Sequence, residues 1–363
     1  MLAGRGEADD PRASRAAAIA RRAGYEVTYI CPRKRTAAGG RLYRVGRSSA
    51  LLRELRGLAR LARLVGTTQR LVRAARRTGR FAVVHAHDFE TLPTGALLRR
   101  RGARLVYDAH ELYADEEPDP PRSYRSVVRL LEPLCARRAD AVVTVGDELA
   151  RELRQRLRRA DDPVVVLSCP FVQHVEPQAR PGRRLRALYQ GATGPGRPLG
   201  DLLDAIASAD GVQLTIRVAN ADLRELRQAV AARGLEEAVE VAAPVPPDRV
   251  VAAAADFHVG LVINRPVTRN DELVLPNKLF EYLMAGLAVV APRLPALRRV
   301  VEDEEVGLTY EPGDPQALGE ALAALAQDRA GLAEMRRRAR RLALERYNAE
   351  AQAQALEQIW RDS

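Results

Sequence analysis

The segment "VLPNKLFEYLMAGLAVVAPRLPAL", residues 274–297, places a short helix directly before a buried strand. Pro276 suits the first turn of a helix and Gly286 suits the residue after its end, so we predict a helix over 276–285. The run "LAVVA" (287–291) is apolar at every position, as expected of a parallel strand that is covered on both faces. A helix followed at once by such a strand favours a doubly wound α/β sheet.

Helices and buried strands also alternate before and after this segment. Short apolar runs without period-two alternation alternate with helical patterns, which is typical of βα repetition and of parallel sheets. The runs that we predict as strands are 25–30, 81–87, 104–109, 141–146 and 163–168 in the first half, and 185–190, 212–219, 239–243, 257–263 and 306–310 in the second.

One irregular stretch divides the two series of strands. "CPFVQHVEPQARPGRR" (169–184) contains three prolines and has no clear periodicity, so it is predicted to contain a linker. A chain of 363 residues is long for one core. We therefore predict two Rossmann-like domains that face each other across a cleft. The predicted parts are an N-terminal domain over 1–172, a linker over 173–184, a C-terminal domain over 185–344, and a closing helix over 345–363 that packs back on the N-terminal domain.

The chain is strongly basic, with a formal net charge of +11 and a pI near 10.1. Nucleic acid, an anionic membrane and phosphorylated substrates would each suit this charge. Much of the excess lies between Arg41 and Arg80, where leucines recur at helical spacing, so an amphipathic helix with a basic face is predicted there. That face is either simply solvated or docks on anionic lipid. Only one aromatic residue, Tyr43, lies among these arginines, which argues against a nucleic-acid partner.

The cysteines and the apolar runs bear on localisation. Cys31, Cys135 and Cys169 are odd in number and far apart, which fits a reducing cytoplasm better than a disulfide framework or a zinc site. No apolar run approaches the roughly 20 residues of a membrane-spanning helix. "MLAGRGEADDPR" has no apolar core of a signal peptide. We expect a cytoplasmic protein, with peripheral contact at the inner face of the membrane through Arg41–Arg80 as an open alternative.

Lys278 is one of only two lysines, with Lys34, in a chain that otherwise uses arginine. It lies near the start of the predicted helix, where the helix dipole already favours anions. A lysine there is therefore favourable if a phosphate binds at this point. Glu281 lies three residues further on the same helical face and could accept hydrogen bonds from hydroxyls. The alternative is a surface Lys–Glu pair worth about 0.3 kcal/mol.

Several histidines follow strands, at the edge where open α/β sheets bind ligands. His110 comes directly after the strand predicted at 104–109 and is a candidate functional residue. His85 and His87 lie on one face of their strand and could hold a metal together with Asp88. Because no further ligand cluster stands out, we expect no metal, and we expect Asp88 to serve the acceptor pocket instead. Structural roles are expected for three others, Asp108, His174 and His258.

The segment "LPNKLFEYLMAGLAVVAPRLPALRRVV" resembles the nucleotide-sugar site of GT-B-fold glycosyltransferases of family 4, the bacterial group 1 type. The family pattern there is Pro-x-Lys-x-x-Glu-Tyr followed by Ala-Gly-x-Pro-Val-Val. Other stretches resemble the same family in the same order, so the resemblance spans almost the whole chain. They are "DPRASRAAAIARRAGYEVTYI" (10–30), "VVHAHDFETLPTGALLRRRGARLVYDAHELY" (83–113), "ADAVVTVGDELARELR" (139–154), "ALYQGATGPGRPLGDLLDAI" (187–206) and "ERYNAEAQAQALEQIW" (345–360).

This resemblance implies a retaining glycosyltransferase that moves a sugar from UDP- or GDP-sugar to an acceptor hydroxyl without a metal or other cofactor. It implies a place in glycan, exopolysaccharide or lipid-linked glycoconjugate biosynthesis. The implied catalytic residues are His110, Lys278 and Arg197, the implied donor site is Gly191, Arg197, Lys278, Leu279 and Glu281, and the acceptor side is Asp88 and Glu111. Lys278 and Arg197 would neutralise the charge that grows on the leaving diphosphate.

Three departures from the family pattern leave alternatives open. Leu273 stands where many relatives have a glutamate, and Glu272 is one residue off. "VAN" (218–220) replaces a glycine-rich turn. Only "MLAGRGEAD" precedes the first predicted helix, so the first strand of the N-terminal sheet is expected to be missing. The alternatives are a catalytically inactive nucleotide-sugar-binding partner protein and a sugar-nucleotide epimerase on the same fold.

Overall fold

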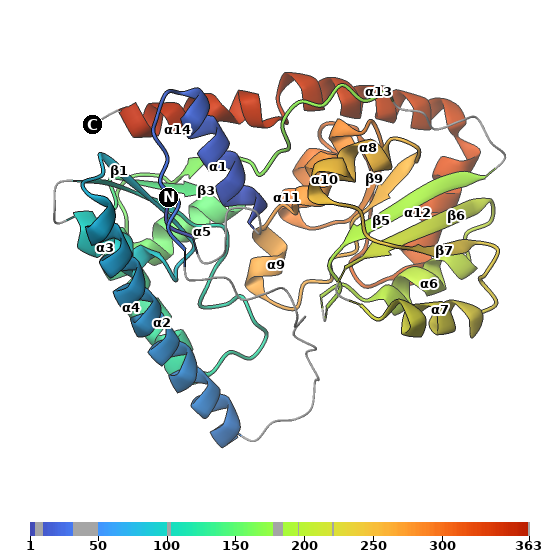
Figure 1. The fold of residues 1–363 in the computed structure, drawn as a ribbon. Coiled ribbons are helices and arrows are strands. Elements are labelled where there is room, and N and C mark those ends of the chain that lie inside the picture. The colour runs from blue at the N-terminus through green and yellow to red at the C-terminus, as the bar shows by residue number, and fades with distance from the viewer. Residues whose placement is uncertain are drawn as a thin grey trace. The chain divides into compact units, whose positions relative to one another are not determined.

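The computed structural model describes residues 1–3, 10–31, 50–99, 103–176, 184–194, 196–219 and 221–361, with the side chains of 50–53 left aside. Part of the predicted linker and the start of the basic stretch Arg41–Arg80 lie outside these residues. The chain forms two compact units (Figure 1). Unit 1 comprises Met1–Leu167, Thr268–Val274 and Gln352–Ser363, and unit 2 comprises Ser168–Val267 and Leu275–Ala351. The cleft between them stays a prediction.

Unit 1 is built on a parallel sheet with the strand order β1-β2-β3-β4. Helices connect these strands as the βα pattern predicts. The strands are β1 (Val83–His87), β2 (Arg104–Asp108), β3 (Ala141–Thr144) and β4 (Val164–Val165), and the connecting helices are α3 (Leu92–Arg99), α4 (Arg122–Ala136) and α5 (Asp147–Leu157).

The N-terminus corrects the expectation that the first strand is missing. Leu2 makes parallel bridges to Ile30 on one side and to Ala86 of β1 on the other. The Leu2 N–H donates to the His85 carbonyl at 2.8 Å, and the Leu2 carbonyl accepts from the His87 N–H at 2.9 Å. Met1–Ala3 therefore satisfy backbone groups that an empty position would leave unpaired. The strand predicted at 25–30 is reduced to its bridge at Ile30.

Four further helices belong wholly or largely to unit 1. Asp10 caps the first of them, because its side chain accepts from the Arg12 and Ala13 N–H groups. The second, which the basic leucine-rich stretch predicts, packs on α3 and α4 through Leu64 and Leu71. The four are α1 (Pro11–Arg22), α2 (Ala50–Thr78), α9 (Arg269–Leu273) and α14 (Ala349–Arg361). The sequence places α9 in the C-terminal domain, whereas the structure groups it with unit 1.

Unit 2 is a six-stranded parallel sheet in the order β10-β9-β8-β5-β6-β7. The two parallel sheets confirm the predicted α/β class. The strands of unit 2 are β5 (Leu185–Gly191), β6 (Val212–Val218), β7 (Val239–Ala242), β8 (Val259–Leu261), β9 (Ala288–Pro292) and β10 (Gly307–Tyr310). Its helices are α6 (Leu199–Ala207), α7 (Leu223–Ala231), α8 (Val250–Ala254), α10 (Asn277–Met284), α11 (Pro295–Val301), α12 (Pro315–Gln327) and α13 (Arg329–Glu345), with a short 3-10 turn at Pro247–Arg249.

The segment that predicts the fold lies at the centre of unit 2. Helix α10 begins after Pro276, and Gly286 follows it with φ 73°, the left-handed conformation that glycine adopts without strain. Every residue of β9 is buried. Tyr282 of α10 packs so closely on β8 that a Cβ at Gly260 would lie 2.2 Å from its ring, so this position requires glycine. Among the described helices, none combines the length and the hydropathy that a membrane crossing requires.

Candidate functional site

The Lys278 side chain is buried at the carboxyl end of β5. Its residue exposure is 8%, and its Nζ has no hydrogen-bond partner among the described residues. The ammonium lies 4.1 Å from the centre of the Tyr189 ring, a cation–π distance. An aromatic face replaces only part of the water that a buried ammonium loses. The site is therefore built to receive an anion or another strong acceptor.

Without a bound anion, the positive charge of Lys278 is unfavourable at this position. Burial, reinforced by the positive charge of Arg197, lowers the pKa of Lys278 to about 7, although Glu281 opposes the change. Gly191, with φ 128°, leaves the space that Lys278 needs, because a Cβ there would lie 3.0 Å from Nζ. The structure thus brings Gly191, Arg197, Lys278 and Glu281 together within unit 2.

Gln190, near the end of β5, contacts the carboxylate of Glu281. The Gln190 amide donates to Glu281 Oε2 at 3.3 Å, and the Gln190 backbone N–H donates to the Tyr282 hydroxyl at 3.0 Å. The amide oxygen of Gln190 is itself buried without a partner among the described residues. Leu279, which the resemblance also assigns to the donor, is fully buried in the core. Its side chain packs within the fold, so a donor contact there would come from its backbone.

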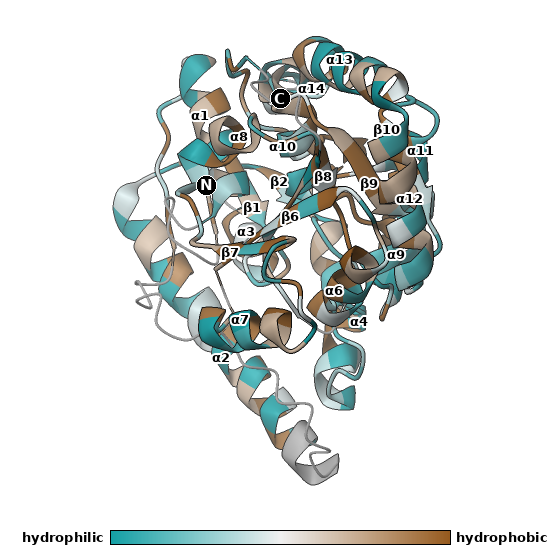
Figure 2. Cartoon of the chain, turned by 90° about the vertical axis from the view of Figure 1, so that its right-hand side faces the viewer, coloured by the Kyte–Doolittle hydropathy of each residue, from teal (hydrophilic) through white to brown (hydrophobic). Residues whose placement is uncertain are grey.

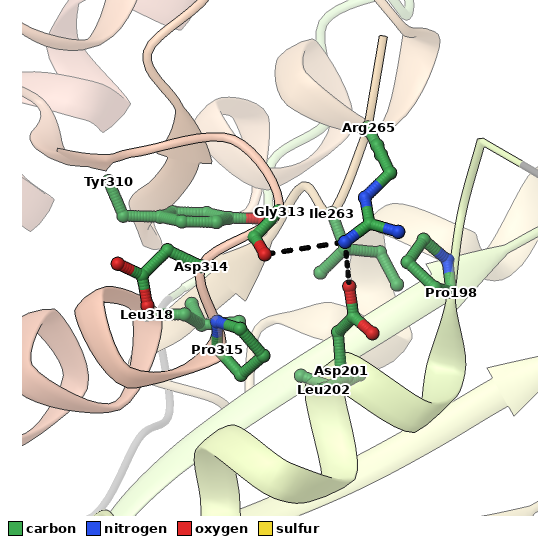
Figure 3. Close-up of a pocket in the computed structure, with 10 residues that line it drawn as sticks. All are labelled: Pro198, Asp201, Leu202, Ile263, Arg265, Tyr310, Gly313, Asp314, Pro315 and Leu318. Carbon is green, nitrogen blue, oxygen red and sulfur yellow. Dashed lines mark hydrogen bonds and ion pairs between the residues drawn. The ribbon is translucent and has the colours of Figure 1, made fainter. Parts of the chain in front are cut away.

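The described residues of the loop that carries Arg197 make backbone hydrogen bonds. The Arg197 N–H donates to the Gly194 carbonyl at 2.8 Å, and the Arg265 N–H donates to the Gly196 carbonyl at 2.8 Å. Figure 3 shows the Arg265 guanidinium between the Asp201 carboxylate, at 3.3 Å, and the Gly313 carbonyl, also at 3.3 Å. These contacts line a small pocket beside α6.

Leu273 explains one departure from the family pattern. It is 3% exposed and belongs to the hydrophobic core of unit 1. Glu272, one residue before it, belongs to unit 1 and forms an ion pair with Arg269. In the same segment, the Asn270 side chain accepts from the Leu112 N–H at 2.7 Å and donates to Glu111 at 3.2 Å. The segment is therefore an anchor in unit 1.

In unit 1, Asp108 lies at the centre of three buried histidines. Its Oδ2 is 3.3 Å from His85 Nε2 and 3.0 Å from His87 Nδ1, and its Oδ1 is 3.1 Å from His110 Nε2. All four residues are less than 9% exposed. Sequence patterns assign Asp108 a structural role and miss this cluster, although three of the four residues lie in strands β1 and β2.

The charge state of the cluster follows from its surroundings. Burial works against ionisation of Asp108, but His110 and the hydrogen bonds from all three histidines outweigh it, and the pKa of Asp108 falls well below its usual range. Burial, with the neighbouring His87, lowers the pKa of His85 to about 4, so that ring is neutral at physiological pH. The Trp360 indole N–H donates to His85 Nδ1 at 3.3 Å.

The same residues can be tested as a metal site. Ligand atoms of His85, His87 and Asp108 all lie within 4.8 Å of one another, so the set replaces the predicted trio with Asp88. The two imidazoles are stacked, however, with centres 4.4 Å apart and planes 7° from parallel. A ring nitrogen binds metal along its lone pair, which lies in the ring plane. One ion therefore cannot satisfy both rings as they stand, and the arrangement suits hydrogen bonding better.

Asp88 and Glu111 are held by partners inside unit 1. Asp88 accepts from Arg12 at 2.9 Å and from the Tyr113 hydroxyl at 2.7 Å, and that hydroxyl accepts from the His110 backbone N–H at 3.2 Å. Burial and the neighbouring Asp88 raise the pKa of Tyr113 well above its usual range. Sequence reasoning missed Arg12 and Tyr113. Their signal was weak, since each lies in an otherwise apolar or irregular stretch.

Two parallel α/β units, one with a buried cation at the end of a central strand, are typical of GT-B glycosyltransferases. A family model described as "Glycosyl transferase 4-like domain" matches residues 10–170, and one described as "Glycosyl transferase-like" matches residues 200–358. Together they cover most of the chain. The chain therefore belongs to the GT-B glycosyltransferases of the group 1 type, which confirms the resemblance seen in the sequence.

Individual relatives agree with this family. D-inositol 3-phosphate glycosyltransferase of Acidothermus cellulolyticus is 27% identical in an alignment 290 residues long that covers 69% of this chain. The match spans about three fifths, 61%, of that relative's own length. Sucrose-phosphate synthase from Thermosynechococcus elongatus superposes with a TM-score of 0.75 at 17% identity, over 96% of this chain and 91% of that one. Anabaena Alr3699/HepE in complex with UDP gives 0.66 at 17% identity, over 81% of each chain.

Proposed function

We propose that this chain is a retaining glycosyltransferase that moves a sugar from UDP- or GDP-sugar to an acceptor hydroxyl. The observation that carries the proposal is the buried Lys278 ammonium. It has no hydrogen-bond partner among the described residues, and the positive charge of Arg197 acts on it. Two cations held together in a buried site are stabilised by a multivalent anion such as a diphosphate. The UDP complex of Anabaena Alr3699/HepE supports this choice by analogy.

The unit 2 residues would act on the leaving group. As the bond between the sugar and the diphosphate breaks, negative charge grows on the diphosphate oxygens, and Lys278 and Arg197 stabilise that charge. Glu281 accepts hydrogen bonds from ribose hydroxyls, a role for which its hydrogen bond from Gln190 orients it. Because two protein cations supply the charge, the proposed reaction proceeds without a metal ion.

The unit 1 residues would contact the sugar and the acceptor. His110 keeps a buried ring nitrogen, Nδ1, without a partner among the described residues, and this nitrogen is proposed to meet a substrate hydroxyl. Glu111 and Asp88 are proposed on the acceptor side. Asp88 already makes contacts to Arg12 and Tyr113, so its contribution is to hold the loop that presents His110.

Nucleotide binding by Lys278→Ala tests the proposal. Titration calorimetry with UDP and GDP should show binding to the wild type and none to the variant, because a truncated side chain leaves the diphosphate without its main cation. Arg224→Ala is the matched control, since Arg224 is an exposed cation on α7 of the same unit. Absence of binding of both nucleotides to the wild type would refute the proposal.

Product analysis separates the alternatives that share nucleotide binding. A transferase releases UDP or GDP from a nucleotide-sugar only when a suitable acceptor hydroxyl is present. An inactive partner protein binds the nucleotide but transfers nothing across a panel of saccharide and lipid-linked acceptors. An epimerase changes the sugar without any acceptor. A coupled assay for released nucleotide, run with and without acceptors, distinguishes the three outcomes.

Helix α2 supports a place at an anionic membrane surface. Arg56, Arg63, Arg70 and Arg77 recur at seven-residue intervals and are all exposed. Leu58 and Val65, also seven residues apart, are 56% and 57% exposed, and Leu55 is 52% exposed. Figure 2 shows the resulting alternation of hydrophilic and hydrophobic bands along α2. Arginines beside an exposed apolar row suit the headgroup region of anionic lipids, so we propose peripheral membrane contact and a lipid-linked or surface-glycan acceptor.

A further inference from the structure

Unit 1 contains a cavity of about 330 Å³ between α4, α5 and the loop that follows β2. All the residues that line it belong to unit 1, and none of them belongs to the Asp108 cluster. Leu112, Ala114 and Leu153 give its wall apolar surface. Sites for small molecules usually enclose about 300–1,000 Å³ and combine apolar walls with a few polar groups. The cavity is therefore large enough for a ligand of the size of a monosaccharide.

Glu132 is the buried acid of this cavity. It is 7% exposed, and its Oε1 accepts from the Tyr107 hydroxyl at 2.6 Å. Tyr107 is its only hydrogen-bond donor among the described residues, so Oε2 can accept from a ligand. Burial raises the pKa of Glu132 to about 7. Above this pH the carboxylate is ionised and can only accept, which suits a ligand hydroxyl.

A second acceptor lies in the same wall. Pro133 occurs inside α4. Because proline has no N–H, the Arg129 carbonyl lacks the hydrogen bond that the fourth residue along a helix normally donates. Arg129 and Pro133 both line the cavity. Adjacent hydroxyls of a sugar would supply donors to this carbonyl and to Glu132 Oε2.

Arg158 adds a positive charge to the lining of the cavity. It ends α5 in the left-handed conformation, with φ 53° and ψ 47°, which is uncommon for a residue other than glycine or asparagine. Its side chain makes no hydrogen bond or ion pair with the described residues. The other two arginines of the cavity, Arg129 and Arg156, are both paired with Asp115. An unpaired guanidinium on a strained backbone residue suits an anionic group such as a phosphate.

We propose that this cavity binds a phosphorylated monosaccharide, with sugar hydroxyls at Glu132 and the Arg129 carbonyl and with the phosphate at Arg158. The site is separate from the proposed donor site, because Lys278 and Glu281 belong to unit 2. It also stands independently of glycosyl transfer, since it follows from the contacts and the cavity within unit 1.

Titration calorimetry with glucose 6-phosphate at about pH 8, where Glu132 is mostly ionised, tests the proposal. The wild type should bind this probe with a Kd of about 1 mM or tighter. Glucose and inorganic phosphate should each bind at least about tenfold more weakly, since each lacks one half of the contacts. Lys278→Met should bind the probe as tightly as the wild type, which separates this site from unit 2.

Arg158→Gly removes the guanidinium without straining the fold, because glycine adopts the left-handed conformation readily. It should weaken binding of the probe at least about tenfold and leave the midpoint of urea unfolding close to that of the wild type. Arg151→Ala is the matched control, since Arg151 is an exposed cation on the same helix and does not line the cavity. This control should bind the probe as the wild type does.

Glu132→Gln tests the hydroxyl contact separately. Its amide oxygen still accepts from Tyr107, while an NH2 group replaces the acceptor Oε2. The variant should bind glucose 6-phosphate at least about fivefold more weakly and should bind inorganic phosphate as the wild type does.

Absence of binding to the wild type, or equal binding by Arg158→Gly, would overturn the proposal. Loss of binding in Lys278→Met would assign the probe to unit 2 and would overturn it as well. Inorganic phosphate that binds as tightly as glucose 6-phosphate would refute the assigned hydroxyl contacts. A protein that binds glucose 6-phosphate through Arg158 but binds neither UDP nor GDP would refute the proposed function and leave this site standing.

Discussion

Replacing Lys278 by methionine should stabilise the protein while removing nucleotide binding. Lys278 is buried, and burial lowers its pKa from 10.5 to about 7. That difference corresponds to roughly 5 kcal/mol of penalty on the protonated side chain in the folded state. Methionine has a similar length and carries no charge, so Lys278→Met removes the penalty. The lost cation–π contact with Tyr189 offsets about 1–2 kcal/mol of that gain.

The stability gained by Lys278→Met should decrease as the pH rises. A lowered folded-state pKa for a lysine means that the unfolded chain binds more protons than the folded protein between about pH 7 and 10.5. The wild type therefore carries the whole penalty below about pH 7 and loses it progressively as the pH rises toward 10.5. We expect Lys278→Met to be roughly 3 kcal/mol more stable than wild type near pH 6, and the difference to shrink to about 2 kcal/mol near pH 9 and toward zero near pH 10.5.

Urea denaturation followed by circular dichroism at several pH values measures both effects, with Arg224→Met as an exposed-cation control. Adding UDP should stabilise the wild type through mass action and leave Lys278→Met unchanged. The reasoning fails if Lys278→Met is less stable than wild type near pH 6, or if the advantage grows as the pH rises. It also fails if the variant still binds UDP, since the ammonium would then not contact the diphosphate.

Three further predictions concern other parts of the chain. Gly191→Ala should destabilise the protein by about 1–3 kcal/mol in urea titrations and weaken UDP binding in calorimetry, because its Cβ would lie 3.0 Å from Lys278 Nζ and its φ is 128°; unchanged UDP affinity would count against the site. Leu273→Glu should not restore a family-like site but should cost about 3 kcal/mol or more, because the carboxylate would enter the core of unit 1; a gain in UDP affinity would contradict the assignment of this segment. Protein should co-sediment with phosphatidylglycerol vesicles at low salt and not with phosphatidylcholine vesicles, and serine at Leu55, Leu58 and Val65 should weaken this binding about tenfold or more; equal binding by that variant would remove the proposed membrane contact.

Sequence patterns predicted the sheets because the relevant signal is local. Strands such as β5 and β9 are continuous apolar runs, and α10 has proline before it and glycine after it, so each element follows from its own residues. The proximity of Lys278 and Glu281 was predictable for the same reason, since three-residue spacing places them on one helical face. The predictions were wrong at positions whose structure is determined by residues far away in the sequence. Three residues, Met1–Ala3, form sheet bridges only because Ile30 and Ala86 flank them.

The Asp108 cluster shows the same limit more sharply. His85, His87 and His110 were each noted as strand-end residues, but the sequence grouped the first two with Asp88, their neighbour in the chain. The structure pairs them with Asp108 instead, because β1 and β2 run side by side and His87 lies opposite Asp108 in their register. Trp360 comes from a helix more than 200 residues further along the chain, and no local pattern links it to His85.

Both candidate sites retain buried polar atoms without hydrogen-bond partners among the described residues. In unit 2 the atoms are the Lys278 ammonium and the amide oxygen of Gln190, and in unit 1 they include ring nitrogens of His87 and His110. Each such group costs about 1–3 kcal/mol in a folded protein, so their presence at the carboxyl ends of parallel strands requires a compensating ligand. The chemistry differs between the units: a cation in unit 2 calls for an anion, whereas lone pairs in unit 1 call for hydroxyl donors. A sugar diphosphate carries both kinds of group.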